Sequence, residues 1–200
     1  MARPRQFHEH EAVGDALQKF WKQGYQGTSI PDLLEATGLE RGSLYKAFGD
    51  KHSLFEKAIG TYLRSGRAAM RQILNAEGSP LDRLRTWIMQ AIHGCSGARG
   101  GPGCFAVNAM IELAPSDAKI RARLARHWSI VEGALEQTLA EGQRAREIRD
   151  DLSAQELARI MLRMIAGIAA FSRQGARADV GETVILLLTA FPGPRQIPRS

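Results

Sequence analysis

Apolar residues recur every three or four positions along nearly the whole chain, which is the spacing of amphipathic helices. Val13, Leu17 and Phe20 mark the buried face of a first helix that ends at Gly24. The further predicted helices cover about 30–37, 41–47, 50–77, 80–95, 105–113, 120–139, 154–171 and 180–191. No stretch shows the sustained alternation of apolar and polar residues that is typical of a strand. The pattern therefore predicts an all-α fold of about nine helices.

The composition adds limits to this fold. Of the 200 residues 44% are hydrophobic, which is enough to bury a core without disulfides or metals. Two cysteines are too few for a secreted disulfide framework and fit a reducing compartment. The N-terminus has no apolar leader, and the longest apolar run, 184–191, is far shorter than the ~20 residues of a membrane span. We expect a cytoplasmic protein with no membrane segment.

The charge balance invites a nucleic-acid partner but does not establish one. The chain has 27 basic and 21 acidic residues, a net charge of +6. Residues 1–57, however, hold eight basic and eight acidic side chains. If this N-terminal part binds DNA, the binding must depend on where individual cations lie.

The two short helices near the N-terminus have the size and spacing of a helix-turn-helix. Gly38 permits the left-handed backbone of the turn between them. Leu33, Leu39, Leu44 and Phe48 would face the first helix, whereas Arg41, Ser43 and Lys46 would lie on the outer face. That outer face is free to enter a major groove. The spacing by itself also fits an ordinary corner between two helices.

The stretch Gly24–Ile30 followed by Leu33, and the stretch Gly38–Lys51 followed by Leu54, resemble the signature of the TetR-type repressors. The resemblance implies a helix-turn-helix DNA-binding domain over residues 1–50. It also implies a helical body over residues 51–200 that binds a small effector and forms a homodimer through its last two helices. Double-stranded operator DNA would then be the partner, and the function would be repression of transcription.

The resemblance places the DNA contacts residue by residue. Thr28 and Ser29 open the second helix, where hydroxyls and free N–H groups can meet a phosphate. Arg41 can pair with guanine, Lys46 can contact a base or a phosphate, and Gly42 permits close approach. The full predicted contact set is Thr28, Ser29, Arg41, Gly42, Ser43, Tyr45, Lys46 and Lys51. Glu40 stands where a Ser or Thr cap is common, which predicts a weaker cap or a carboxylate within reach of cytosine.

The body offers two ways of sensing an effector. Cys104 follows a glycine-rich stretch at a helix start, where the positive helix end lowers a thiol pKa. The surrounding residues resemble a subgroup of the family in which some members sense electrophiles or metals through such a cysteine. Cys104 can equally be a small buried residue beside a reversible apolar ligand held between Trp87, Phe105, Met110 and Trp128. Cys95 lies on an apolar stripe, which favours the core.

Three other interpretations fit the same residues. The apolar last helix can be the core of a monomer in place of a dimer interface. A cysteine beside His93 or His127 can form the nucleophile and base of a thiol enzyme, and the arginine-rich body can bind a membrane surface. No nucleotide loop, metalloprotease motif or serine elbow accompanies them, and the spacing of His93, Cys95 and Cys104 is not diagnostic of a metal site. We expect no enzymatic activity, cofactor or metal.

Overall fold

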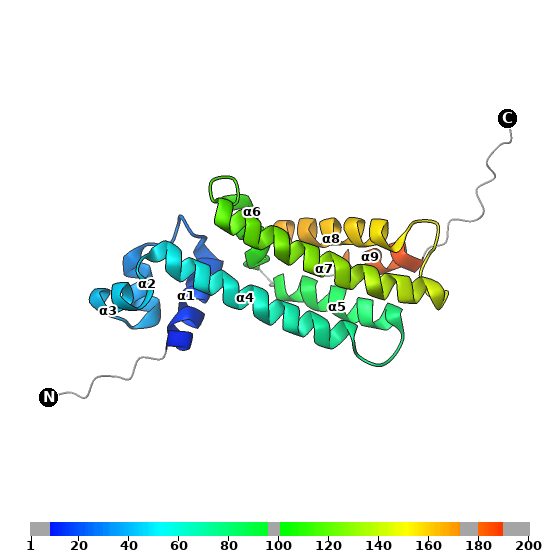
Figure 1. Cartoon of the computed structure of the whole chain (residues 1–200), viewed down its shortest axis with the longest axis horizontal. Helices are drawn as coiled ribbons and strands as arrows, with labels where there is room; N and C mark the ends of the chain where they lie inside the picture. The colour runs from blue at the N-terminus through cyan, green and yellow to red at the C-terminus, as the bar shows by residue number, and fades with distance from the viewer. Residues whose placement is uncertain (1–8, 96–100, 173–179, 190–200) are drawn as a thin grey trace. The chain divides into compact units, whose positions relative to one another are not determined.

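The computed structural model describes residues 9–95, 101–172 and 180–189, and these form nine helices without a strand (Figure 1). The helices are α1 (Glu9–Gln23), α2 (Ile30–Thr37), α3 (Arg41–Phe48), α4 (Lys51–Leu74), α5 (Pro80–Cys95), α6 (Phe105–Glu112), α7 (Ala118–Arg144), α8 (Ala154–Phe171) and α9 (Val180–Thr189). The predicted all-α class is confirmed. None of these described helices is long and apolar enough to cross a membrane.

Capping side chains start several helices where the sequence predicts them. Asp50 accepts a hydrogen bond from the backbone N–H of Ser53 at 2.6 Å, at the start of α4. Ser153 forms a capping box with Glu156 at the start of α8. The α4 helix ends at Leu74, earlier than the predicted residue 77, and the chain then turns through Gly78, whose φ is 112°. Residues 96–100 of the glycine-rich stretch, and residues 190 and 191 of the last predicted helix, lie outside the described residues.

Contacts divide the chain into two compact units. The first contains the residues up to Gly66 together with Phe105–Ala125, and the second contains Arg67–Cys104 and the residues from Arg126 onward. The helices α4 and α7 each run through both units. The predicted DNA-binding domain, residues 1–50, lies within the first unit, which also includes part of α4, all of α6 and part of α7.

The first unit has a core of aromatic rings contributed by α1, α4 and α6. Phe55 packs edge-to-face against Phe20 and Phe105, with ring centroids 5.1 and 5.5 Å apart. Tyr62 and Trp21 extend this cluster at the Phe105 ring. Such edge-to-face pairs add to the apolar burial that holds helices together. The cluster therefore fixes α6 against α1, the first helix of the predicted DNA-binding domain.

The second unit is a helical bundle with an aliphatic core. Its buried side chains come from α4, α5, α7, α8 and α9, and include Met70, Ile88, Leu135, Met161 and Val184. Arg83 on α5 donates to the Leu74 carbonyl at 2.5 Å and to Glu141 on α7 at 2.6 Å. These contacts tie α5 to the end of α4 and to α7.

Candidate nucleic-acid interface and effector residues

The two short helices α2 and α3 have well-defined ends. Ser29 caps α2 in a capping box: its Oγ accepts from the Asp32 N–H at 3.2 Å, and its own N–H donates to Asp32 Oδ2 at 2.8 Å. Gly38 ends α2 with φ 66°, in the left-handed region, and its N–H donates to the Leu34 carbonyl at 2.9 Å. The turn therefore has the left-handed glycine that the sequence predicts.

The α3 helix separates cleanly into a buried face and an exposed face. Leu44 and Phe48 are buried, as predicted. The exposed residues are Arg41, Gly42, Ser43, Tyr45 and Lys46. Glu40 occupies the N-cap, and its side chain makes no capping hydrogen bond with the described residues, which agrees with the weaker cap expected there. A short helix with one polar face exposed in this way can lie in a major groove.

Two of the predicted DNA-contacting residues have other partners. The Thr28 side chain is 0% exposed, and its Oγ1 donates to the Gly24 carbonyl at 2.6 Å. The hydroxyl closes the turn between α1 and α2 in this structure, which does not favour the phosphate contact predicted for it. The Lys51 ammonium lies 4.3 Å from the centroid of the Tyr25 ring, and burial lowers the pKa of Lys51.

Glu112, at the end of α6, holds the turn between α1 and α2. Its Oε2 accepts from the Tyr25 N–H at 2.9 Å, and its Oε1 accepts from the Gln26 N–H at 2.7 Å. Gly24 has φ 77°, and a Cβ placed there would lie 3.0 Å from Glu112 Oε2. Sequence reasoning did not find this contact, because a single acidic residue on a helix carries no signal of which backbone groups it will meet.

Further polar contacts join α4 to the start of α7 within the first unit. His52 Nε2 lies 2.6 Å from Asp117 Oδ2, and this hydrogen bond holds the pKa of Asp117 below its usual range. Lys119 donates to Glu56 at 2.6 Å, and Arg123 donates to the Glu56 backbone carbonyl, also at 2.6 Å. These bonds hold α4 and α7 together next to the helices that carry the predicted DNA contacts.

The two cysteines lie together in the second unit. Cys95, the last residue of α5, is 7% exposed, and Cys104, just before α6, is half-buried; neither forms a disulfide. A hydrogen bond with the Cys104 sulfur, and then burial, raise the pKa of the Cys95 thiol. Cys95 is thus in the core as predicted. His93 Nδ1 donates to the backbone carbonyl of Met89 at 2.7 Å. No group of three metal-binding side chains occurs among the described residues.

The four residues of the predicted apolar ligand pocket have different environments. In the first unit, Phe105 is buried in the aromatic core, whereas Met110 is exposed. In the second unit, Trp87 and Trp128 pack half-buried against the aliphatic core. The Trp128 indole N–H is buried and has no hydrogen-bond partner among the described residues. It is therefore a donor that a bound molecule can satisfy.

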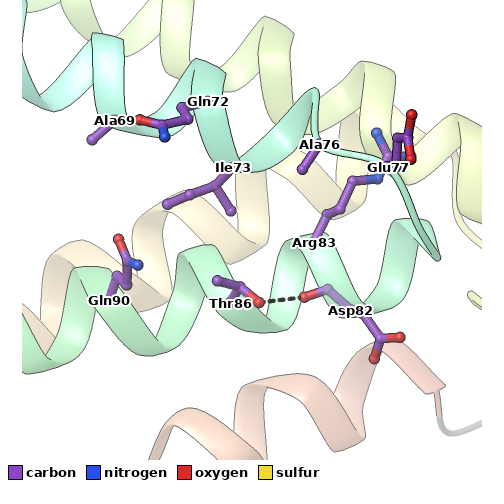
Figure 2. Close-up of a pocket in the computed structure, with 9 residues that line it drawn as sticks. All are labelled: Ala69, Gln72, Ile73, Ala76, Glu77, Asp82, Arg83, Thr86 and Gln90. Atoms are coloured by element: carbon purple, nitrogen blue, oxygen red, sulfur yellow. Dashed lines mark hydrogen bonds between the residues drawn. The ribbon is translucent and has the colours of Figure 1, made fainter.

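A pocket of about 450 Å³ lies elsewhere in the second unit, between the end of α4 and the start of α5. Figure 2 shows Gln72 and Ile73 of α4 on one side and Thr86 and Gln90 of α5 on the other. Thr86 donates to the Asp82 carbonyl at 2.8 Å, so this hydroxyl is already satisfied. None of the predicted effector residues lines this pocket.

His127 on α7 is a buried, uncharged base. Its side chain is 8% exposed, and its Nδ1 has no partner among the described residues. Burial, and then the charge of Arg67, lower the pKa of His127 to about 4. The imidazole is therefore neutral near pH 7 and packs against Trp128, with ring centroids 4.8 Å apart.

We expect His127 to make the protein less stable in mild acid. The folded pKa is lowered, so the unfolded chain takes up the proton first, and stability falls as the pH drops from about 6.5 towards 4. A shift of this size corresponds to about 3 kcal/mol. Urea unfolding of His127→Gln measured across this pH range will show a flatter acid limb than the wild type. Parallel acid limbs for the two proteins would exclude His127 as the cause.

Comparison with known proteins identifies the family. Residues 14–58 match the family of "Bacterial regulatory proteins, tetR family", and residues 80–183 match "Tetracyclin repressor-like, C-terminal domain". The chain is 30% identical over 178 residues to the HTH-type transcriptional repressor ComR of Escherichia coli (strain K12), which covers 88% of this chain and 85% of ComR. It is 29% identical over 162 residues to the uncharacterized HTH-type transcriptional regulator YezE of Bacillus subtilis (strain 168), covering 80% of this chain and 84% of YezE.

Solved structures agree with the sequence relatives. A cysteine mutant of the TetR family transcriptional regulator CifR, in complex with 26-base-pair operator DNA, is 25% identical with a TM-score of 0.79 and covers 95% of this chain and all of that one. A TetR family regulator from Agrobacterium tumefaciens has the same fold, with a TM-score of 0.80 at 19% identity over 92% of this chain and all of that one. With its helix-turn-helix, its two family matches and its relatives over most of its length, the chain belongs to the TetR family of DNA-binding transcriptional regulators.

Proposed function

We propose that the protein is a homodimeric repressor that binds operator DNA through α3 and leaves it when a small effector acts on the helical body. The observation that carries this proposal is the exposed polar face of α3, which lies opposite a buried apolar face of the same helix. The relative ComR is a transcriptional repressor, and the similar structure of CifR contains operator DNA, which supports the same function here. Because the matched family is one of bacterial regulatory proteins, whose DNA lies in the cytoplasm, we place the protein there.

The proposed contact set divides by chemistry. Arg41 reads a guanine through its two parallel N–H donors, and Lys46 contacts a base or a phosphate. Gly42 and Ser43 let the helix approach closely. Tyr45, Lys51 and the N-terminal end of α2 at Ser29 hold the phosphate backbone. Thr28 is left out of this set because its hydroxyl is buried and already bonded.

Replacing Arg41 tests the proposed reading helix. Arg41→Ala is expected to lose about 1–3 kcal/mol of operator binding and to relax the sequence preference at one position of each half-site. Operator sequences are first selected from a genomic DNA pool with the wild type, and affinities are then measured by fluorescence anisotropy at physiological salt. Arg71→Ala, which removes an exposed arginine from the second unit, is the matched control. Equal wild-type affinity for selected and random DNA would contradict the proposal.

The dimer is proposed to form through α8 and α9. Both helices bury one face in the second unit and expose large apolar side chains on the other: Ile160, Phe171, Leu186 and Leu187. Phe171 is 66% exposed, which is costly for so large an apolar ring in water. A Cβ at Gly167 on α8 would meet nothing within 4 Å, so this position leaves room for a second helix. A second copy of the chain is the simplest partner for this surface.

Cys104 is proposed as the residue that responds to a thiol-reactive effector. It is more exposed than Cys95 and precedes α6, whose other end holds the turn of the DNA-binding helices through Glu112. The second candidate is a reversible ligand in the second unit, favoured by the buried Trp128 N–H, which has no partner in the described part of the chain.

Graded electrophiles distinguish the two candidate effectors. Wild type and Cys104→Ser are treated with the same series while release from operator DNA is measured. We expect the serine variant to resist release, because it lacks the nucleophile. Release of both proteins at the same doses would exclude the cysteine and leave the reversible ligand.

A further inference from the structure

The chain has two cysteines, and the fold brings them into contact although nine positions of sequence separate them. Neither cysteine forms a disulfide, and hydrogen bonding with the Cys104 side chain is the largest cause that raises the pKa of the Cys95 thiol. The surrounding backbone is anchored, because the Gly103 N–H donates to the Cys95 carbonyl at 3.3 Å and the Ser172 hydroxyl donates to it at 2.9 Å. Gly103 has φ 73°, so the turn that returns Cys104 to the end of α5 uses a conformation that favours glycine.

We propose that Cys95 and Cys104 form a disulfide within one chain when a hydroperoxide oxidises them. The inference deepens the proposed function, because it names the class of effector to which Cys104 responds and assigns Cys95 a chemical part. A disulfide requires neighbouring Cβ atoms and an S–S bond of about 2.05 Å. The Gly103 N–H bond to the Cys95 carbonyl holds the residue before Cys104 against Cys95, which places the two side chains next to each other.

The two thiols differ in the way that such a reaction needs. Cys95 is buried, and a buried thiol keeps its proton because burial disfavours the thiolate. Cys104 is more exposed and stands at the N-terminal end of α6, where the helix dipole favours a negative charge. Cys104 is therefore the sulfur that meets the oxidant, and Cys95 is the sulfur that resolves the product.

The reaction balances in two steps. The Cys104 thiolate attacks one peroxide oxygen, the O–O bond breaks, and the alkoxide leaves with a proton as an alcohol; Cys104 becomes a sulfenic acid. The Cys95 thiol then gives up its proton and attacks the Cys104 sulfur, expelling the hydroxyl as water. Overall, two thiols and one hydroperoxide give one disulfide, one alcohol and one water.

The proposed disulfide can act on the DNA-binding helices through α6. Cys104 is bonded directly to Phe105, the first residue of α6. Within the first unit, Phe105 packs against Phe55 and Tyr62, and Glu112 at the other end of α6 binds the turn before α2. Drawing Cys104 towards Cys95 therefore pulls on the start of a helix whose end positions the helix-turn-helix.

The test uses hydrogen peroxide on the reduced full-length protein. We expect both free thiols to disappear together, the intact mass to fall by two hydrogens per chain, and a peptide map to contain a linked pair from residues 95 and 104. On a non-reducing gel the oxidised protein is expected to run as a single chain. Cys95→Ser treated in the same way is expected to stop at a Cys104 sulfenic acid that dimedone traps.

Two results would overturn the inference. One is a wild-type protein in which Cys104 gains oxygen while Cys95 remains a free thiol; the other is a disulfide that joins two chains. Both are read from the wild type, so they do not depend on the folding of the serine variant.

Operator affinity of the isolated oxidised form separates this inference from the proposed function. We expect affinity to fall about 5–150-fold. If the disulfide forms and affinity is unchanged, the inference stands and the proposed thiol-triggered release fails. If electrophiles at Cys104 release DNA but peroxide forms no disulfide, the proposed function stands and this inference fails.

Discussion

Leu187→Arg is expected to convert the protein from a dimer of about 44 kDa into a monomer of 22.0 kDa (2 × 22.0 kDa against 22.0 kDa) that no longer holds its operator. Leu187 lies on α9 and is 46% exposed in the single chain. An arginine is therefore tolerated by the fold of one chain. In a two-fold symmetric dimer the same change occurs twice, and each copy buries an unpaired charge.

The expected loss in the free energy of dimerisation is large because both copies carry the substitution. Breaking a buried contact with an uncompensated charge costs about 3–5 kcal/mol, so two copies weaken dimerisation by at least roughly 10⁴-fold. Operator binding falls with it, because a dimer reads two half-sites and a monomer reads one. Sedimentation velocity at micromolar concentration measures the first effect, and fluorescence anisotropy with selected DNA measures the second.

Gln137→Arg is the matched control, since it adds the same charge at an exposed polar position of α7 within the second unit. It is expected to remain a dimer. Circular dichroism will show the same helix content for both variants, so that loss of the dimer is not confused with unfolding. A wild type that sediments at 22 kDa, or a Leu187→Arg variant that sediments as a dimer, would exclude this interface.

The sequence predicted what depends on local patterns. Period and capping residues placed the helices, because Asp50 and Ser153 act on N–H groups only three residues away. The faces of α3 followed from the same period, with Leu44 inward and Arg41 outward. Gly38 was predictable as a left-handed residue because few other residues adopt that conformation at low cost.

The contacts that sequence reasoning missed join distant parts of the chain. Glu112 accepts hydrogen bonds from the backbone N–H groups of Tyr25 and Gln26, which lie 87 and 86 positions earlier in the chain. No local pattern encodes such a partner. The Thr28 hydroxyl had two possible acceptors, a phosphate or a carbonyl four residues earlier, and burial decided for the carbonyl. The contact of Cys95 with Cys104 depends on the return of the chain to α5, which period alone does not give.

Glu112→Ala is expected to loosen the turn before α2, lower operator affinity and blunt the response to an effector. The substitution leaves the N–H groups of Tyr25 and Gln26 without their carboxylate. Hydrogen bonds to a charged group contribute about 1.5–3 kcal/mol each. The exposed Gln26 N–H can donate to water in place of the carboxylate, which recovers part of this loss. We expect a net loss of about 2–3 kcal/mol in the free energy of unfolding.

The thermal midpoint gives a first measure, since about 2–4 °C are lost per kcal/mol in a chain of this size. Glu112→Gln keeps one acceptor oxygen without the charge, so we expect it to fall between wild type and alanine. Glu77→Ala is the control for removing a carboxylate, because Glu77 is exposed in the turn after α4. Its free energy of unfolding is expected to stay within about 0.5 kcal/mol of the wild-type value.

Effector response separates a positioning role from a merely stabilising one. If Glu112 transmits movement of α6 to the DNA-binding helices, Cys104 modification will release DNA from the wild type much more strongly than from Glu112→Ala, measured at a temperature where both are folded. A purely stabilising contact predicts that both proteins lose the same factor in operator affinity. The free energies of two uncoupled changes add. If Cys104 modification therefore lowers operator affinity by the same factor in wild type and in Glu112→Ala, Glu112 is excluded as the link.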